Sequence, residues 1–295
     1  MDKLPEACIV NVLAFLSPGE ACRLSTLSSM FKLGTESDAL WEKFLPKNYK
    51  SIIESSSDPS LMERCPSKKD LYMCLSDNLL LIDRGLKSIS LEKFSGKAIY
   101  MIFAKELTIV WSDTPSYWRW FNDPQSRFTE VAELVGVCWL EIRGKINTNR
   151  LSKRTLYGAY FVFQFTDRFY GFEDCPVEVS VRIGGRELSK KTFPICSGRR
   201  RGVRGFQRIL RNSFLPRYRM ENQVPMVADS TPGGVEYSGC MKNRGDGWFE
   251  VELGDFLRRD DSDGEELEMA FVEVEQGCWK GGLRVQGIEI RPKKL

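Results

Sequence analysis

The chain has 295 residues, 42% of them hydrophobic and 12% aromatic, with a formal net charge of +3. This is enough for one small domain and one core of about 180 to 200 residues, and no apolar run approaches the roughly 18 residues that span a bilayer. The sequence has no histidine, the commonest general base and zinc ligand, so Ser-His-Asp catalysis, Cys-His catalysis and histidine-containing metal sites are excluded.

Residues 4–45 show the spacing of three short amphipathic helices. Leu4-Pro5 opens the first helix, and Ser17-Pro18-Gly19-Glu20 opens the second as a capping box with proline at the first helical position. The second helix ends at Gly34, and the third begins near Ser37. The apolar positions of the three helices are Ile9, Val12, Leu13 and Leu16; Ala21, Leu24, Leu27 and Phe31; and Leu40, Trp41 and Phe44.

A segment this short seldom sustains a core alone. We therefore expect its surplus apolar side chains to contact a partner or the rest of the chain. The pattern resembles an F-box, the motif that binds a Skp-type adaptor in cullin-based ubiquitin ligases. The alternative is a helical cap on the next domain, and we favour docking. The resemblance implies docking through Leu4, Pro5, Ile9, Leu13, Leu16, Leu24, Leu27, Phe31, Leu40 and Trp41.

Residues 1–46 are therefore predicted to form the F-box and residues 47–95 a helical and extended linker. A loop is expected at Ser55–Pro59, a helix capped by Ser67 and running through Leu75, and a strand at Leu79–Ile82 that enters a turn.

From Ala98 onward, apolar residues alternate with polar ones, as in half-buried strands. Many such segments with few helical patterns between them favour an antiparallel β-sandwich over an α/β fold. The predicted fold class is thus α+β, with a three-helix domain followed by the sandwich. The strand candidates include Tyr100–Trp111, Val137–Lys145, Tyr157–Phe165, Val177–Ile183, Trp248–Leu253, Leu267–Glu275 and Leu283–Arg291.

The densest aromatic cluster, residues 111–120, follows the first of these strands. An exposed indole beside polar groups suits the apolar face of a sugar ring, although tryptophans more often pack in a core. The segments Leu107–Trp111, Val137–Ile142, Asp246–Glu250 and Trp279–Leu283 resemble the phloem protein 2 family, which includes the tobacco agglutinin Nictaba. The resemblance covers residues 96–295.

The family resemblance implies a jelly-roll-like lectin domain that recognises N-acetylglucosamine oligomers or N-glycan cores. It places the carbohydrate-binding residues at Trp111, Trp118, Glu266 and Glu273. The two glutamates are seven residues apart, so a regular strand would point them to opposite faces unless a bulge or turn intervenes. For each glutamate, a solvated strand face is the alternative to a ligand role.

Charge is unevenly distributed along the chain. Residues 182–219 carry twelve Lys and Arg against one acidic residue, and we expect them to form a long loop. Arg199 to Arg219 could be a solvated loop or a functional basic patch, and we do not expect nucleic-acid binding, because no fold signature accompanies the run. Nine scattered cysteines without a CxxC pair, several in apolar patterns (Cys8, Cys22 and Cys138), suggest reduced, buried thiols and a location in the nucleus and cytoplasm.

These observations predict a non-enzymatic adaptor without cofactors. Its F-box would dock to a Skp-type adaptor and so join a cullin, while the β domain holds a target protein, an N-glycosylated one if the lectin resemblance extends to function. The alternatives are a lectin that acts without a ligase, and an adaptor whose β domain binds protein instead of sugar.

Overall fold

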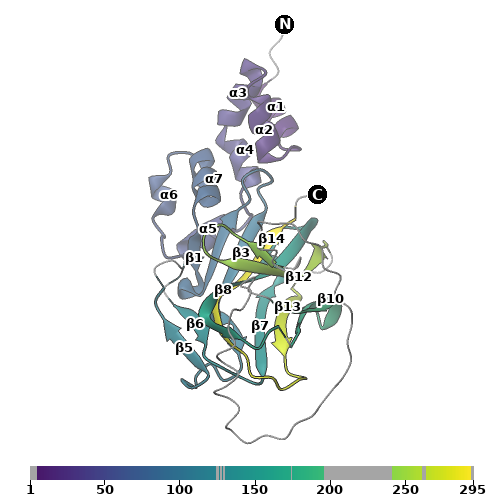
Figure 1. The fold of residues 1–295 in the computed structure, drawn as a ribbon. Coiled ribbons are helices and arrows are strands. Elements are labelled where there is room, and N and C mark those ends of the chain that lie inside the picture. Colours follow the sequence, from purple (N-terminus) through teal and green to yellow (C-terminus); the bar gives the residue numbers. More distant parts are fainter. Residues whose placement is uncertain are drawn as a thin grey trace, which may run out of the picture.

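The computed structural model describes residues 5–123, 126, 128, 130–173, 175–195, 241–260 and 264–293. Short helices form the N-terminal part and antiparallel strands the remainder, which confirms the predicted order of a helical and a β part (Figure 1). Leu4 and the segment Arg199 to Arg219 lie outside the described residues. Within the described ranges, no helix is both long and apolar enough to cross a membrane.

Four helices, not three, occupy the first 45 residues: α1 (Glu6–Leu13), α2 (Pro18–Leu24), α3 (Ser29–Glu36) and α4 (Asp38–Phe44). The predicted second helix is broken because the Ser25 and Thr26 hydroxyls donate hydrogen bonds to backbone carbonyls three residues earlier, at 2.7 and 2.8 Å. Ser28 then caps a new helix, accepting a bond from the Met30 N–H at 3.2 Å. Gly34 lies inside α3, where a Cβ would be only 2.7 Å from Ile9 Cγ2.

The capping box at the start of α2 is confirmed. The Glu20 N–H donates to Ser17 Oγ at 3.3 Å, and the Ser17 N–H donates to Glu20 Oε2 at 2.8 Å. These reciprocal bonds satisfy two N–H groups that the helix itself leaves without partners.

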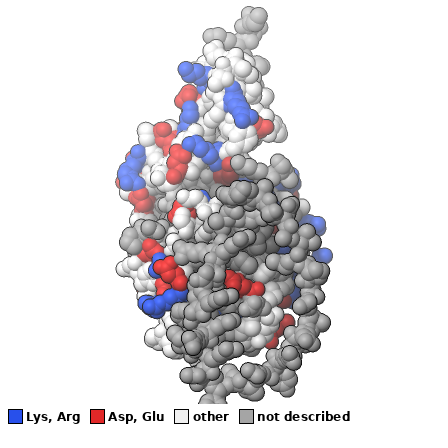
Figure 2. Space-filling model, viewed as in Figure 1, with Lys and Arg blue, Asp and Glu red and all other residues white. Residues whose placement is uncertain are grey.

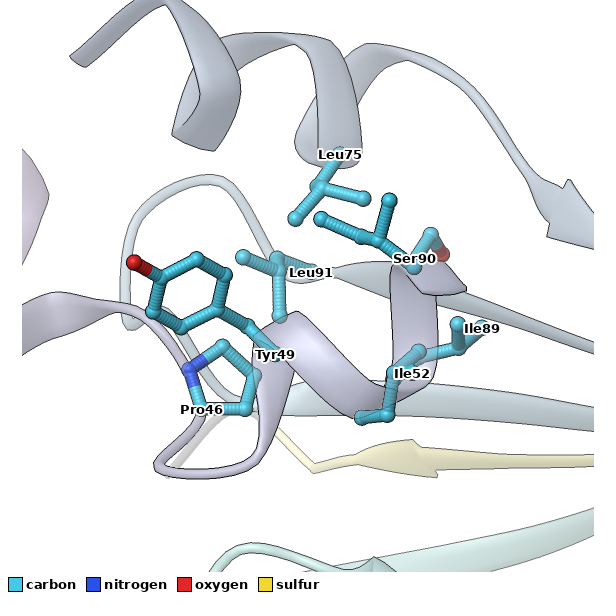
Figure 3. Close-up of a pocket in the computed structure, with 8 residues that line it drawn as sticks. Pro46, Tyr49, Ile52, Leu75, Ile89, Ser90 and Leu91 are labelled. Carbon is cyan, nitrogen blue, oxygen red and sulfur yellow. The ribbon is translucent and has the colours of Figure 1, made fainter. Parts of the chain in front are cut away.

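The segment predicted as a linker packs against both the N-terminal helices and the β domain. It contains α5 (Tyr49–Glu54), α6 (Leu61–Arg64), α7 (Lys68–Asp77), β1 (Leu80–Ile82) and β2 (Lys87–Leu91), with Ser67 capping α7 as expected. Strands β1 and β2 form one edge of the larger sheet. Figure 3 shows apolar side chains of α5, α7 and β2 around a cavity of about 10 Å³, including Tyr49, Leu75 and Leu91. This volume is at the lower limit for one water molecule, so the cavity is a packing gap and not a ligand site.

Within the described residues, the β domain consists of two antiparallel sheets. One has nine strands, with the order β1-β2-β3-β14-β8-β12-β11 and with β5 and β6 attached through β14. The other has five, with the order β10-β9-β13-β7-β4. The remaining strands are β3 (Ala98–Phe103), β4 (Thr108–Ile109), β5 (Trp118–Phe121), β6 (Val131–Leu134), β7 (Leu140–Asn147), β8 (Thr155–Tyr170), β9 (Val177–Ile183), β10 (Arg186–Phe193), β11 (Met241–Asn243), β12 (Phe249–Arg258), β13 (Glu266–Glu273) and β14 (Gly281–Pro292).

The two sheets share one apolar core. The Phe161 ring of β8 stacks on the Phe271 ring of β13 with 4.1 Å between centroids, which joins the inner faces of the two sheets. This packing is typical of two amphipathic sheets that bury their apolar faces against each other.

Three local predictions are wrong. The expected strand Tyr100–Trp111 is split into β3 and β4 by a 3₁₀ turn at Ala104–Glu106, because the chain crosses here from one sheet to the other. The start of the basic stretch is not a loop but β10, whose exposed charged side chains protect a sheet edge. Cys8 is exposed rather than buried.

The expectation that all thiols are reduced is also wrong. Cys175 and Cys278 form a disulfide across 103 residues, with their Cα atoms 6.5 Å apart. Gly281 of β14 pairs with Tyr170 at the end of β8, and this pairing brings the two cysteine-bearing segments together. Such a long-range pairing leaves no trace in cysteine spacing.

Candidate functional site

The predicted docking residues of the N-terminal helices fall into three groups. Leu16, Leu24 and Phe31 are half-buried, and Pro5 and Leu27 are exposed, with Leu27 at 75%. The fully buried members, which stabilise the helical part itself, are Ile9, Leu13, Leu40 and Trp41.

Trp41 illustrates why these residues are buried. Its indole N–H donates to the Thr35 carbonyl at 2.8 Å, and its ring lies 5.6 Å from Phe44 and 5.1 Å from Tyr72. Because Tyr72 belongs to α7, Trp41 packs the N-terminal helices against the following segment.

Three further apolar side chains in this part of the chain are exposed, and the predicted docking residues do not include them. Val12 and Leu33 are exposed, and Phe15 is 92% exposed. We define Val12, Phe15, Leu27 and Leu33 as the exposed helical face. Figure 2 shows that the surface formed by the N-terminal helices has uncharged areas between scattered charged groups. The sequence signal was available, since Leu33 lies off the buried stripe of α3 and Phe15 follows the end of α1.

The N-terminal helices contact the β domain at the turn between β2 and β3. The Gly19 N–H donates to the Phe94 carbonyl at 2.9 Å, and the Arg23 guanidinium lies 4.9 Å from the Phe94 ring centroid. A Cβ at residue 19 would overlap that ring, so only glycine allows this approach. Beside this contact is a cleft of about 360 Å³ lined by residues that include Cys22, Tyr72 and Lys93.

At the other candidate site, the structure gives the two predicted tryptophans different environments. Trp111 follows β4, is 41% exposed and has a φ of 60°, with its ring 5.2 Å from that of Tyr117. Trp118 is only 2% exposed, and its indole N–H donates to the Val110 carbonyl at 3.1 Å. Of these two tryptophans, Trp111 alone presents its ring to solvent.

The structure also separates the two predicted glutamates. They occupy the two ends of β13, which pairs with β7 without a register shift, so seven residues place them about 23 Å apart. Glu266 is exposed and pairs with Lys145 Nζ at 2.6 Å. Glu273 is buried and forms an ion pair with Lys280, whose ammonium also donates to the Cys138 carbonyl at 3.1 Å. The prediction that the two side chains face opposite ways is confirmed.

Two further tryptophans, which sequence reasoning did not select as site residues, are exposed. Trp139 precedes β7, and Trp279 precedes β14. The Trp139 indole N–H donates to Glu141 Oε2 at 3.1 Å, while Arg143 Nε donates to Glu141 Oε1 at 2.7 Å. The Arg143 bond, followed by the Trp139 bond, holds the pKa of Glu141 below its usual value, so this carboxylate stays ionised beside the exposed indole. The available signal was position, because both tryptophans stand just before a strand.

We define Trp111, Tyr117, Trp139 and Trp279 as the aromatic end of the β domain. Strand β8 shows that this end lies far from the helices. Near its start, the Tyr157 hydroxyl donates to the Ala98 carbonyl at 3.0 Å, close to the turn that contacts Gly19. Tyr170, at the other end, packs beside Gly136, whose N–H donates to the Tyr117 carbonyl. Thirteen residues of strand correspond to about 43 Å, and β5 and β6 lie opposite the helices in Figure 1.

Comparison with known proteins identifies the family. The model of the family described as Phloem protein 2 matches residues 97–292. F-box protein VBF of Arabidopsis thaliana is 42% identical over 294 residues, which cover 99% of this chain and 100% of that protein. F-box protein PP2-B13 of the same plant is 41% identical over 295 residues, covering 100% of both chains. F-box protein PP2-B1, also from Arabidopsis, is 40% identical over 308 residues, covering 99% of this chain and 90% of that protein. The chain therefore belongs to the phloem protein 2 family and is a plant F-box protein of the phloem protein 2 type.

Proposed function

We propose that this protein is the substrate-recognition adaptor of an SCF-type cullin ubiquitin ligase. Its helices dock to a Skp-type adaptor, and its β domain holds a target protein for ubiquitination and proteasomal degradation, in the nucleus and cytoplasm. The observation that carries the proposal is the presence of two exposed apolar surfaces at opposite ends of one molecule, the exposed helical face and the aromatic end. The chain does no covalent chemistry in this scheme, because tethering alone raises the target's effective concentration near the ubiquitin-charged enzyme.

The exposed helical face is the part of the F-box that remains free for docking. Burying one leucine or phenylalanine side chain contributes about 1.5–3 kcal/mol, so Phe15 and Leu27 together could supply several kcal/mol of binding energy. Several large apolar groups exposed on one small helical unit are typical of protein interaction sites.

Co-purification with a Skp-type adaptor tests the docking step. The double variant Phe15→Asp/Leu27→Asp places charges on the exposed face, so we expect at least a hundredfold loss of adaptor binding with an unchanged thermal transition. Leu188→Asp on β10, which also replaces an exposed leucine, is the matched control and should bind normally. Leu13→Asp and Trp41→Ala are unsuitable probes because both residues are buried. Normal adaptor binding by the double variant would exclude docking through this face.

For the aromatic end, we propose that a jelly-roll-like sandwich binds the glycan of an N-glycosylated target. The exposed Trp111 ring and the ionised Glu141 carboxylate beside Trp139 support this, because indole faces pack on sugar C–H groups and carboxylates accept bonds from sugar hydroxyls. Glycan-array binding that is lost in Trp111→Ala, and kept in a Leu257→Ala control on β12, is the expected result.

A second candidate is an adaptor whose β domain recognises a protein surface. It is favoured by the internal engagement of Trp118 and Glu273, two of the four residues that the family resemblance assigns to sugar. Wild-type protein that binds no glycan, yet delivers a target to the ligase through the aromatic end, would support this alternative. A lectin that acts without a ligase would instead bind glycans and ignore the Skp-type adaptor.

A further inference from the structure

The segment that carries Trp111 is held by two other tryptophans. The Trp118 indole N–H donates to the Val110 carbonyl at 3.1 Å, and the Trp120 indole N–H donates to the Ser112 carbonyl at 2.8 Å. These carbonyls belong to the residues on either side of Trp111. Both indoles project from β5, which pairs with β6 over residues 118–121, so the two donors are fixed to a sheet.

Backbone hydrogen bonds also connect the same segment to β7 and to itself. The Val110 N–H donates to the Glu141 carbonyl at 3.1 Å, and the Thr114 N–H donates to the Trp111 carbonyl at 3.0 Å. Trp111 itself has a φ of 60°, in the left-handed region that bulky residues seldom occupy. Such a conformation persists only where surrounding contacts hold it, and the two indole bonds supply these contacts.

We propose, on the basis of the carbohydrate function proposed above, that the paired tryptophans have different tasks: Trp111 contacts the sugar, and Trp118, together with Trp120, is a positioning residue that holds Trp111 in its exposed conformation. Trp118 cannot stack on a sugar ring in this structure because it is buried. Its donor group is also occupied by the chain's own backbone.

Trp139 extends the contact surface. Its indole is exposed and is oriented by Glu141, the residue whose carbonyl also accepts the Val110 N–H. Val110, the residue before Trp111, and the Trp139 indole are therefore bonded to the same residue of β7.

Fluorine NMR of the full chain labelled with 5-fluorotryptophan tests this division. The protein has seven tryptophans, and single Trp→Phe variants assign the signals. On titration with N,N′,N″-triacetylchitotriose, the Trp111 and Trp139 signals should shift while the Trp118 signal stays. Trp118→Phe and Trp120→Phe keep an aromatic ring but remove the donor, so each should weaken binding about fivefold.

The same variants have a second readout that needs no sugar. Each should shift and narrow the Trp111 signal, because that ring becomes mobile. Trp248→Phe, which alters a buried tryptophan in a separate cluster, is the matched control and should leave both binding and the Trp111 signal unchanged.

The outcomes separate the inference from the function beneath it. If Trp118→Phe weakens binding while the Trp111 signal stays in place, Trp118 contacts the sugar directly and the inference is wrong. An unchanged Trp111 signal in both Trp118→Phe and Trp120→Phe also overturns the inference. If no signal responds to chitotriose, the proposed sugar binding fails, while the sugar-free spectra still decide whether Trp118 and Trp120 hold Trp111.

Discussion

The buried ion pair between Glu273 and Lys280 allows a direct test of whether Glu273 stabilises the fold or binds ligand. Both side chains are almost completely buried, and they join the end of β13 to the start of β14. Glu273 Oε1 also accepts a hydrogen bond from the Gln276 N–H at 3.0 Å, while Oε2 faces the Lys280 ammonium. Removing one partner of such a pair leaves an uncompensated buried charge, which costs about 3–5 kcal/mol.

We expect Lys280→Met and Glu273→Gln each to lower the free energy of unfolding by about 3–5 kcal/mol. The double variant should lose clearly less than the sum of the two, because neither charge is then left alone. Urea denaturation followed by tryptophan fluorescence measures this directly, and an unchanged m-value would show that the midpoint shift reflects stability.

Glu266→Gln is the matched control, since it lies on the same strand and pairs with a lysine at the protein surface. Exposed ion pairs contribute little, so its transition should match that of the wild type. Equal destabilisation by Glu266→Gln and Glu273→Gln would refute the reasoning. So would a Glu273→Gln variant of normal stability that has lost ligand binding, because Glu273 would then act as a ligand residue.

Three further predictions address other parts of the molecule. Burial raises the pKa of Glu289, but the charges of Arg244 and Arg291 outweigh burial and hold this pKa below the ordinary 4.5. The carboxylate therefore stabilises the fold above its unfolded pKa, and this contribution is lost as the pH falls through the folded pKa. Acid unfolding of Glu289→Gln should thus depend less on pH below about 4.5 than acid unfolding of the wild type. Phe94→Ala removes the ring that meets Gly19 and Arg23, so limited proteolysis should cut faster between the helical part and the β domain, with unchanged rates inside the β domain. Cys175→Ser opens a disulfide that closes a long loop, which should lower the free energy of unfolding by about 2–4 kcal/mol, and dithiothreitol should destabilise the wild type but not this variant.

Local signals in the sequence were reliable wherever the deciding contacts are local. The capping box at Ser17 and Glu20 and the cap at Ser67 involve bonds that span three residues, so the sequence reveals them directly. Strand parity was also predictable, because side chains alternate at every residue, and this alternation placed Glu266 and Glu273 on opposite faces.

The sequence misled where a long-range contact overrides a local pattern. The apolar run from Tyr100 to Trp111 has the composition of one strand, but the chain changes sheets inside it. The break after α2 depends on hydroxyl groups that compete for backbone carbonyls, which an apolar stripe does not reveal. The Cys175–Cys278 disulfide depends on the pairing of β8 with β14.

The sequence by itself determined the kind of protein: helices with a surplus of apolar side chains, an antiparallel β domain, no histidine chemistry and a two-part family resemblance. Only the tertiary structure decided which of those apolar and charged residues are free to act. Trp111 and Trp118 have the same side chain seven residues apart, yet one is exposed and the other is buried. Burial depends on which distant segments pack together, and a sequence pattern reports only on a residue's neighbours along the chain.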